Sequence, residues 1–92
     1  MKLKKVQYFL KIVEKGSLSK AANSVGLIQP TLTRFLAGLE KEAGTKLFSR
    51  GKDNSLTLTT AGLIYLEAAR KINVIWNNML ADLRNEQDNS TE

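Results

Sequence analysis

Four apolar residues near the start of the chain recur at the spacing of a helix. Steps of three, one and three separate Val6, Phe9, Leu10 and Val13. Because residues three and four apart lie on one face of a helix, this pattern predicts a helix over about residues 3–15 with one buried side. Gly16 follows this segment and is expected to end it.

The next stretch, residues 17–43, predicts two helices joined by a tight corner. The hydroxyl of Ser17 can cap the first helix. Gly26 stands at the corner, since glycine adopts a positive φ at no steric cost, and Leu27 can return to the core. Pro30 suits the first turn of the second helix, where its missing amide would have had no partner. Together these features are the pattern of a helix-turn-helix.

The second helix of this pair has one apolar stripe and one face that is small, polar and basic. The stripe consists of Leu32, Phe35, Leu36 and Leu39. Opposite the stripe and on its flanks lie Pro30, Thr31, Thr33, Arg34, Ala37 and Lys41. Such a face suits the major groove of DNA, because Arg can form two hydrogen bonds with guanine, Thr can touch a thymine methyl group and Lys can reach a phosphate.

Two short runs further along predict a β-hairpin. Residues 46–50 and 55–59 form these runs, the second strictly alternating, and Gly51-Lys52-Asp53-Asn54 separates them. A hairpin that follows a helix-turn-helix is a wing. Arg50 and Lys52 are its candidates for contact with the DNA backbone or the minor groove.

The last part of the chain predicts one long helix, capped by Thr59 or Thr60 and extending to about Glu86. Apolar residues recur along it at steps of four and three, at Tyr65, Ala69, Ile72, Trp76, Met79 and Leu83. This heptad seam predicts pairing with a second copy of the helix. The alternative is that the stripe packs on its own domain, which we expect of its first two turns. The chain then divides into a DNA-binding domain over 1–59, a linker and dimerisation helix over 60–85 and a polar tail over 86–92.

Several short motifs follow one another in order along the chain. They are Phe9, Gly16-Ser17-Leu18, Ala21-Ala22, Gln29-Pro30-Thr31-Leu32-Thr33, Leu39-Glu40, Gly44, Leu47-Phe48-Ser49-Arg50 and Leu58-Thr59-Thr60-Ala61-Gly62. Over about residues 1–85 this set resembles the amino-terminal DNA-binding domain of LysR-type transcriptional regulators. The resemblance implies a mainly α fold, a winged helix-turn-helix of three helices and a two-stranded wing, followed by a long linker helix that pairs two subunits.

The exposed face of the second helix and the resemblance together indicate which residues meet DNA. We expect the major groove to receive Gln29, Pro30, Thr31, Thr33 and Arg34, and the DNA backbone or wing contacts to come from Ser17, Lys41, Arg50 and Lys52. The sequence departs from the family pattern at three of its positions. Ile28 stands where a capping serine is usual, Phe35 where a smaller or polar residue is usual, and Asp53 where a basic residue is frequent.

These features predict sequence-specific binding of a homodimer to a pseudo-palindromic site in double-stranded DNA, for the regulation of transcription. The alternative is an adaptor, a winged helix that dimerises and binds proteins without reading DNA. In full-length relatives the linker helix leads into an effector-binding domain, which this chain lacks, so we expect no small-molecule effector here. Either the chain was cut at the hinge or it is a module of its own.

The charge of the chain is concentrated in its first half. Residues 1–52 hold eleven Lys and Arg against three Glu, a net charge of +8, whereas residues 53–92 hold three against six acidic residues, a net charge of −3. A concentrated basic surface favours a polyanionic partner, because neutralised phosphates release their counterions. The alternative is a lysine-rich surface that is simply solvated.

Composition excludes several other classes of function. With 92 residues, 42% of them apolar, the chain is expected to form one small soluble domain, and its lack of Cys and His removes the usual metal ligands, so no metal or cofactor is expected. Ser17-Leu18-Ser19-Lys20 has the Ser-x-x-Lys spacing of some acyl-transfer enzymes, but their partner motifs are missing, and we expect no enzyme. No signal peptide or membrane span is recognisable, which favours the cytoplasm.

Overall fold

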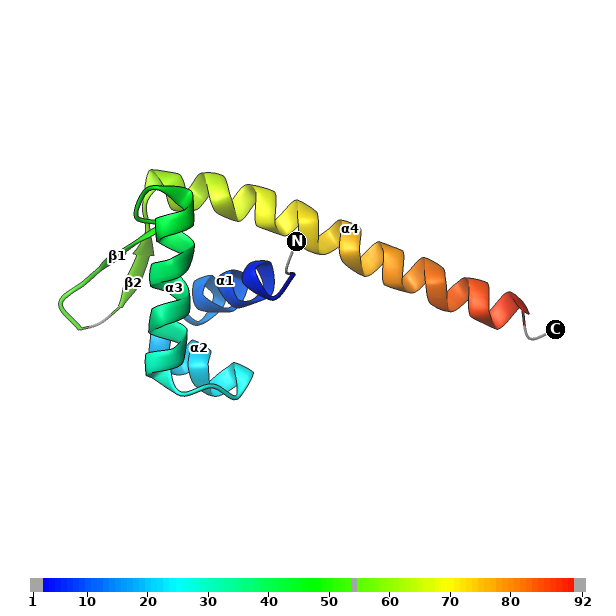
Figure 1. The fold of residues 1–92 in the computed structure, drawn as a ribbon, viewed down its shortest axis with the longest axis horizontal. Coiled ribbons are helices and arrows are strands. Elements are labelled where there is room, and N and C mark those ends of the chain that lie inside the picture. Colours follow the sequence, from blue (N-terminus) through cyan, green and yellow to red (C-terminus); the bar gives the residue numbers. More distant parts are fainter. Residues whose placement is uncertain (1–2, 54, 91–92) are drawn as a thin grey trace.

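The computed structural model describes residues 3–53 and 55–90. Its elements, in chain order, are α1 (Leu3–Lys15), α2 (Leu18–Val25), α3 (Gln29–Ala43), β1 (Phe48–Arg50), β2 (Leu56–Leu58) and α4 (Thr60–Ser90). The first five elements form a small domain, and most of the length of α4 extends away from this domain (Figure 1). The molecule is therefore elongated and measures 58 × 26 × 18 Å. The predicted winged helix-turn-helix with a long last helix is confirmed.

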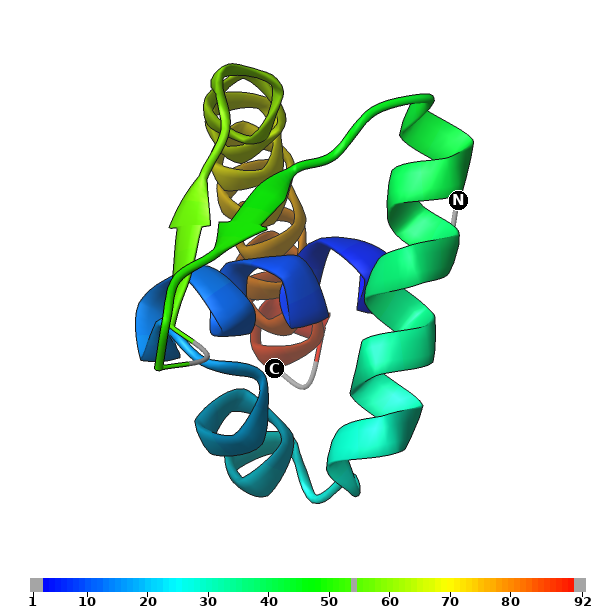
Figure 2. The same ribbon diagram turned by 90° about the vertical axis from the view of Figure 1, so that its left-hand side faces the viewer.

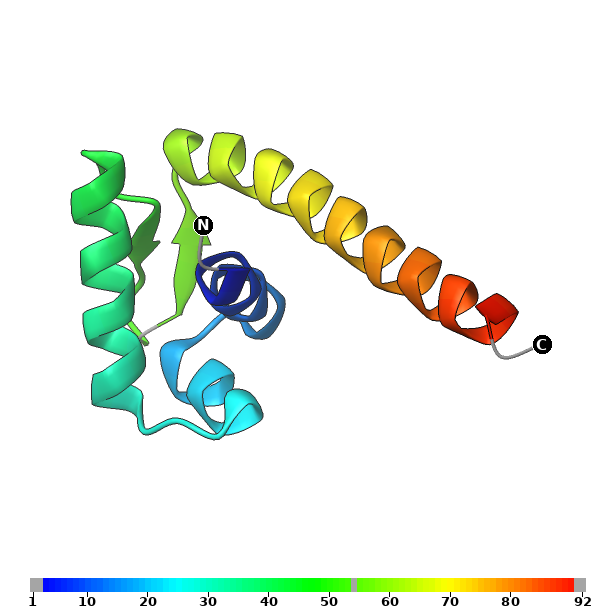
Figure 3. The same ribbon diagram turned by 45° about the vertical axis from the view of Figure 1, so that its right-hand side comes forward.

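Helix α1 lies at the centre of the domain. Figure 2 shows it crossing between α3 and the hairpin, with α2 beneath it, and Figure 3 shows it under the first turns of α4. Its fully buried residues include Phe9 and Ile12, whereas Leu10 and Val13 are only partly buried. The predicted buried face was therefore incomplete, because α1 packs against α2, β2 and α4 together and so buries more than one stripe.

The corner of the helix-turn-helix forms as predicted. The Ser17 hydroxyl accepts a hydrogen bond from the Lys20 amide at 3.2 Å and so caps α2. Gly26 ends α2 with a φ of 73°, in the left-handed region that favours glycine. The next amide, that of Leu27, donates to the Ala22 carbonyl at 2.9 Å, and the Leu27 side chain packs against the core. This geometry turns the chain into α3.

The hairpin and the start of α4 share one joint. In the hairpin, Phe48 pairs with Leu58 and Arg50 with Leu56. These strands are shorter than the predicted runs, but hydrogen bonds between the two runs extend beyond the strands: the Thr59 amide donates to the Leu47 carbonyl at 3.0 Å, and its hydroxyl donates to the Lys46 carbonyl at 2.7 Å. The same hydroxyl accepts from the Gly62 amide at 3.0 Å, so Thr59 caps α4.

Helix α4 is longer than the sequence predicted. It continues past Glu86 to Ser90, so the first residues of the predicted polar tail, from 86 to 90, are helical, and residues 91 and 92 lie outside the described residues. The reason is that neither Gly nor Pro follows Gly62 in the sequence, and nothing in the backbone chemistry therefore stops the helix. Over the part of the chain that the structure describes, no helix is apolar enough along its length to cross a membrane.

Two glycine substitutions are predicted to change stability in opposite directions. A Cβ on Gly62 would collide with the Leu47 carbonyl oxygen, whereas a Cβ on Gly38, exposed within α3, would meet nothing within 4 Å. Gly62→Ala should therefore destabilise the protein by about 1–3 kcal/mol. The matched control, Gly38→Ala, should stabilise it by up to about 1 kcal/mol, the difference in helix propensity.

Urea unfolding of both variants at one protein concentration measures the two effects. If Gly62→Ala unfolded at the same urea concentration as the unmodified protein, the prediction that Gly62 of α4 packs too closely on the Leu47 carbonyl to accept a Cβ would be wrong.

Candidate nucleic-acid interface

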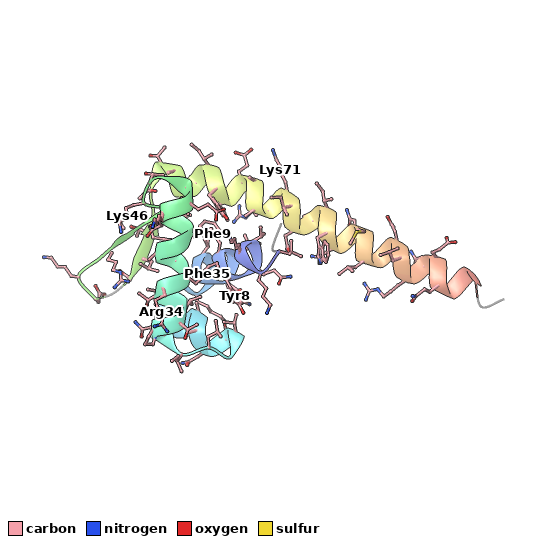
Figure 4. The ribbon with its side chains drawn as sticks, viewed as in Figure 1. Tyr8, Phe9, Arg34, Phe35, Lys46 and Lys71 are labelled. Carbon is pink, nitrogen blue, oxygen red and sulfur yellow. The ribbon has the colours of Figure 1, made fainter. Side chains whose placement is uncertain are left out.

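The N-terminal half of α3 presents the predicted readout residues to solvent. Gln29, Pro30 and Arg34 are exposed, and Thr31 and Thr33 are half-buried on the flanks. In the view of Figure 4, Arg34 lies on the left of α3, the side on which the wing lies, whereas Phe35 points to the right toward Tyr8. The two rings meet edge to face with their centroids 5.3 Å apart. Phe35 therefore packs inward, and Arg34 is left on the outer surface.

The cations of this surface are not neutralised within the protein. The ion pairs of the described residues join Lys5 to Glu42, Lys11 to Glu14, Lys46 to Glu40 and Lys71 to Glu67. Arg34, Lys41, Arg50 and Lys52 are exposed and take part in none of these pairs. Positive charge on the helix-turn-helix and the wing is thus available to an external anion.

A cavity of about 400 Å³ joins the start of α2 to the wing. Its lining brings together three of the predicted site residues that are far apart in sequence, Ser17, Gln29 and Arg50. Lys15 and Lys20 also line it, as does Asp53, which reduces the local positive charge. Cations beside the N-terminus of a helix suit a phosphate group.

Lys15 and Lys20 were not predicted from the sequence to lie at this site, and neither was given a role. The available signal was Ser17: its position as the cap of α2 places Lys20 in the first turn and Lys15 just before the cap. Lys41 lies elsewhere, about two turns beyond Arg34 on α3, beside a separate surface hollow with Thr45 and Lys46.

Glu40 fixes the wing to the same helix that carries Arg34. One oxygen of its carboxylate, Oε2, accepts hydrogen bonds from the amides of Leu47 at 2.7 Å and Phe48 at 3.3 Å, at the entry to β1. The Glu40 side chain is only 11% exposed, and its other oxygen lies 3.7 Å from the Lys46 ammonium. Glu40 was recognised from the sequence as part of a motif, but this role was missed because its partners lie beyond the turn that ends α3.

A groove of about 370 Å³ runs between α3 and the wing beside this contact. Thr33 and Arg50, both predicted site residues, line it from opposite sides, and Glu40 lies among its lining residues. The position of the wing relative to Thr33 therefore depends on the Glu40 contact.

The predicted dimerisation seam on α4 divides into two parts. Tyr65, Ala69 and Ile72 pack on the protein's own core, where the Tyr65 ring lies 4.5 Å from that of Phe9. Burial raises the pKa of the Tyr65 hydroxyl, and the Glu42 carboxylate raises it further. By contrast, Trp76, Met79 and Leu83 remain exposed, so the seam packs on its own domain only over its first turns, and the alternative does not hold for the rest of it.

The sequence matches a known protein family over most of the chain. Residues 3–63 match the family described as bacterial regulatory helix-turn-helix proteins of the lysR family. The HTH-type transcriptional regulator BsdA of Bacillus subtilis is 36% identical over 72 residues, which are 78% of this chain and 25% of that protein. The HTH-type transcriptional regulator XapR of Escherichia coli is 39% identical over 79 residues, 86% of this chain and 26% of that protein. The chain spans about a quarter of the length of these relatives.

Solved structures share this fold over more than nine-tenths of the chain. The crystal structure of the CbnR_DBD–DNA complex covers 94% of this chain and 98% of its own, with 30% sequence identity and a TM-score of 0.82. That of the BenM_DBD complex with catB site 1 DNA covers 92% and 94%, with 30% identity and a TM-score of 0.84. Both relatives are DNA-bound, and both match this chain over nearly their full lengths.

Removing the Glu40 carboxylate is predicted to destabilise the protein through the entry to β1. Glu40→Ala leaves the amides of the buried residues Leu47 and Phe48 without their acceptor, which should cost about 1–3 kcal/mol. Glu40→Gln keeps one carbonyl acceptor but loses the charge, and its cost should be about 1 kcal/mol.

Urea unfolding measures both costs, and amide hydrogen exchange at Leu47 and Phe48 should quicken in the same order. Glu42→Gln is the control, because its ion pair with Lys5 is exposed and worth at most about 1 kcal/mol. Equal stability of the Glu40→Ala and Glu42→Gln variants would refute the role of Glu40 at this joint.

Proposed function

The chain belongs to the lysR family of bacterial regulatory helix-turn-helix proteins, and we propose that it binds double-stranded DNA sequence-specifically, as a homodimer, to regulate transcription. The observation that carries the proposal is Arg34, exposed on α3 beside the half-buried Thr33 and outside the ion pairs of the described residues. Relatives of the same fold, whose crystal structures contain DNA, support it.

In this proposal the N-terminal half of α3 enters the major groove. Arg34 reads a guanine through two hydrogen bonds, and Thr33 packs against the methyl group of a neighbouring thymine. Gln29, Pro30 and Thr31 lie beside them and complete the contact with the base edges. The exposure of Gln29, Pro30 and Arg34 supports this arrangement, since a reading side chain must be free before DNA arrives.

Contacts with the sugar-phosphate backbone position the domain without selecting a sequence. Ser17, Lys41, Arg50 and Lys52 serve this purpose, and Lys15 and Lys20 join them at the cavity beside α2. Because each neutralised phosphate releases counterions, affinity should fall steeply as the salt concentration rises.

Residues 60–85 pair two subunits, residues 1–59 read DNA, and residues 86–92 take no part in either. The exposed apolar side chains of Trp76, Met79 and Leu83 support this division, since they are 38%, 39% and 54% exposed on one stripe of α4. Two copies related by a twofold axis require an approximately palindromic site. Binding of bacterial DNA would take place in the cytoplasm.

Selection from random duplex DNA tests the proposal directly. The purified chain should enrich a twofold symmetric sequence, bind it less tightly at the higher of two salt concentrations, and have the mass of a dimer. Absence of DNA binding at both salt concentrations would overturn the proposal and favour the protein-binding adaptor.

Two substitutions should separate base reading from positioning. Arg34→Ala is expected to weaken binding by about 1–3 kcal/mol and to relax specificity at one base position of each half-site. Lys52→Ala should weaken all sequences alike and reduce the slope of log affinity against log salt by about 1 for each phosphate that is no longer neutralised. Repeating the selection and the salt titration with both variants measures this, and an equal loss of affinity on every sequence for both would show that Arg34 reads no base.

A charge on the exposed stripe of α4 is expected to break the dimer. Met79→Glu places a carboxylate in the proposed apolar contact, and burying it unpaired costs several kcal/mol, so dimerisation should weaken about 100-fold or more. Asn77→Glu is the matched control, since Asn77 is exposed and about 160° from Met79 around the helix. Sedimentation equilibrium measures both variants, and equally stable dimers would place the contact elsewhere.

A further inference from the structure

The winged helix-turn-helix has one large apolar side chain that is exposed to solvent, that of Ile28. Among the described residues, the exposed large hydrophobic side chains lie on α4 from Leu63 onward, with the single exception of Ile28. Ile28 is 67% exposed and is not among the residues that pack on the core. It lies between the corner of the helix-turn-helix and the first residue of α3.

Ile28 also occupies a position at which another residue type would stabilise the fold. It is the N-cap of α3, with extended backbone angles of φ −81° and ψ 149°, and its side chain makes no capping hydrogen bond. Only its carbonyl is used, accepting from the Thr31 amide at 3.1 Å and the Leu32 amide at 3.4 Å. Ser, Thr, Asp or Asn would add a side-chain acceptor here. The Ile28 side chain therefore stabilises the folded domain neither by packing nor by capping.

The location of Ile28 indicates what the side chain contacts instead. The next two residues, Gln29 and Pro30, are exposed with it and form the leading end of α3. Gln29 also lines the cavity with Ser17 and Arg50, which the proposed function places against DNA. Ile28 thus lies at the edge of the proposed DNA surface. In the major groove, the one apolar group that a base edge presents is the 5-methyl group of thymine.

We propose that Ile28 reads a thymine in each half-site by packing on its 5-methyl group. The proposal rests on the proposed function and extends it to a residue outside the expected readout set. Cytosine has no such methyl group and presents an amino donor beside the same edge, so an isoleucine selects thymine over it. Polar readout then comes from Arg34 and Gln29, and apolar readout from Ile28 together with Thr33.

Replacing thymine with deoxyuridine tests the contact, because it removes the methyl group and nothing else. Each thymine of the selected duplex is exchanged in turn, symmetrically in both half-sites, and the affinity of the chain is measured. Besides the exchange at the thymine assigned to Thr33, we expect one exchange to lower the affinity of the unmodified protein about fourfold per half-site, the effect of burying one methyl group. With Ile28→Ser that exchange should make no difference, whereas the control Ile28→Val should keep most of the effect.

The readouts separate this proposal from its alternatives. Ile28→Ser should raise the melting temperature, since it restores a cap, so a lost thymine preference cannot come from unfolding. If every methyl effect persists unchanged in Ile28→Ser, the effects belong to other residues, such as Thr33, and the proposal is overturned. Specific DNA binding in which no exchange matters overturns it too and leaves Ile28 to a protein partner. If the unmodified protein binds no DNA, the proposed function itself fails, which the first titration reveals.

Discussion

Burial of the Phe9 side chain is the interaction on which the arrangement of the molecule depends. Its ring is fully buried and lies 5.3 Å from that of Phe48 at the start of the wing and 4.5 Å from that of Tyr65 on α4. One side chain of α1 thus joins the two elements that leave the helix-turn-helix. Burying such a ring stabilises the fold by about 1.5–3 kcal/mol, and each aromatic pair adds about 0.5–1.5 kcal/mol. In a domain this small, that is a large share of the total stability.

A non-directional apolar contact holds elements together but does not set their register. Directional bonds do so here: Glu40 accepts from the amides that open β1, and Thr59 bonds to the carbonyls just before it. Because these bonds satisfy the backbone around the aromatic cluster, the wing is fixed to α3 on one side and to α4 on the other. The exposed face of α3 can then stay polar, basic and unpaired.

A structural feature could be predicted from the sequence when the residues that determine it lie close together in the chain. Periodicity, the Ser17 cap and Gly26 placed the first three helices and the corner correctly, because caps and turns are decided within a few residues. Glu40 was missed as the anchor of the wing, since its partners lie beyond the next turn of chain. Ile12 was missed because the pattern indicated one buried face where α1 has neighbours on several sides. The proposed readout by Gln29 to Arg34 remains a prediction, since contacts with DNA depend on a molecule outside the chain.

The apolar seam of α4 shows the same limit of prediction from local sequence patterns. Periodicity alone does not distinguish an apolar residue that packs on its own domain, such as Ala69, from one left for a partner, such as Met79. In the proposed dimer, the exposed stripe joins the subunits, and the Thr59 joint sets the direction in which α4 leaves each domain. The separation of the two α3 helices, and with it the spacing of the half-sites, then follows from that direction. Since Thr59 bonds to the carbonyls that precede the wing, the contacts that set half-site spacing also position the wing on each half-site.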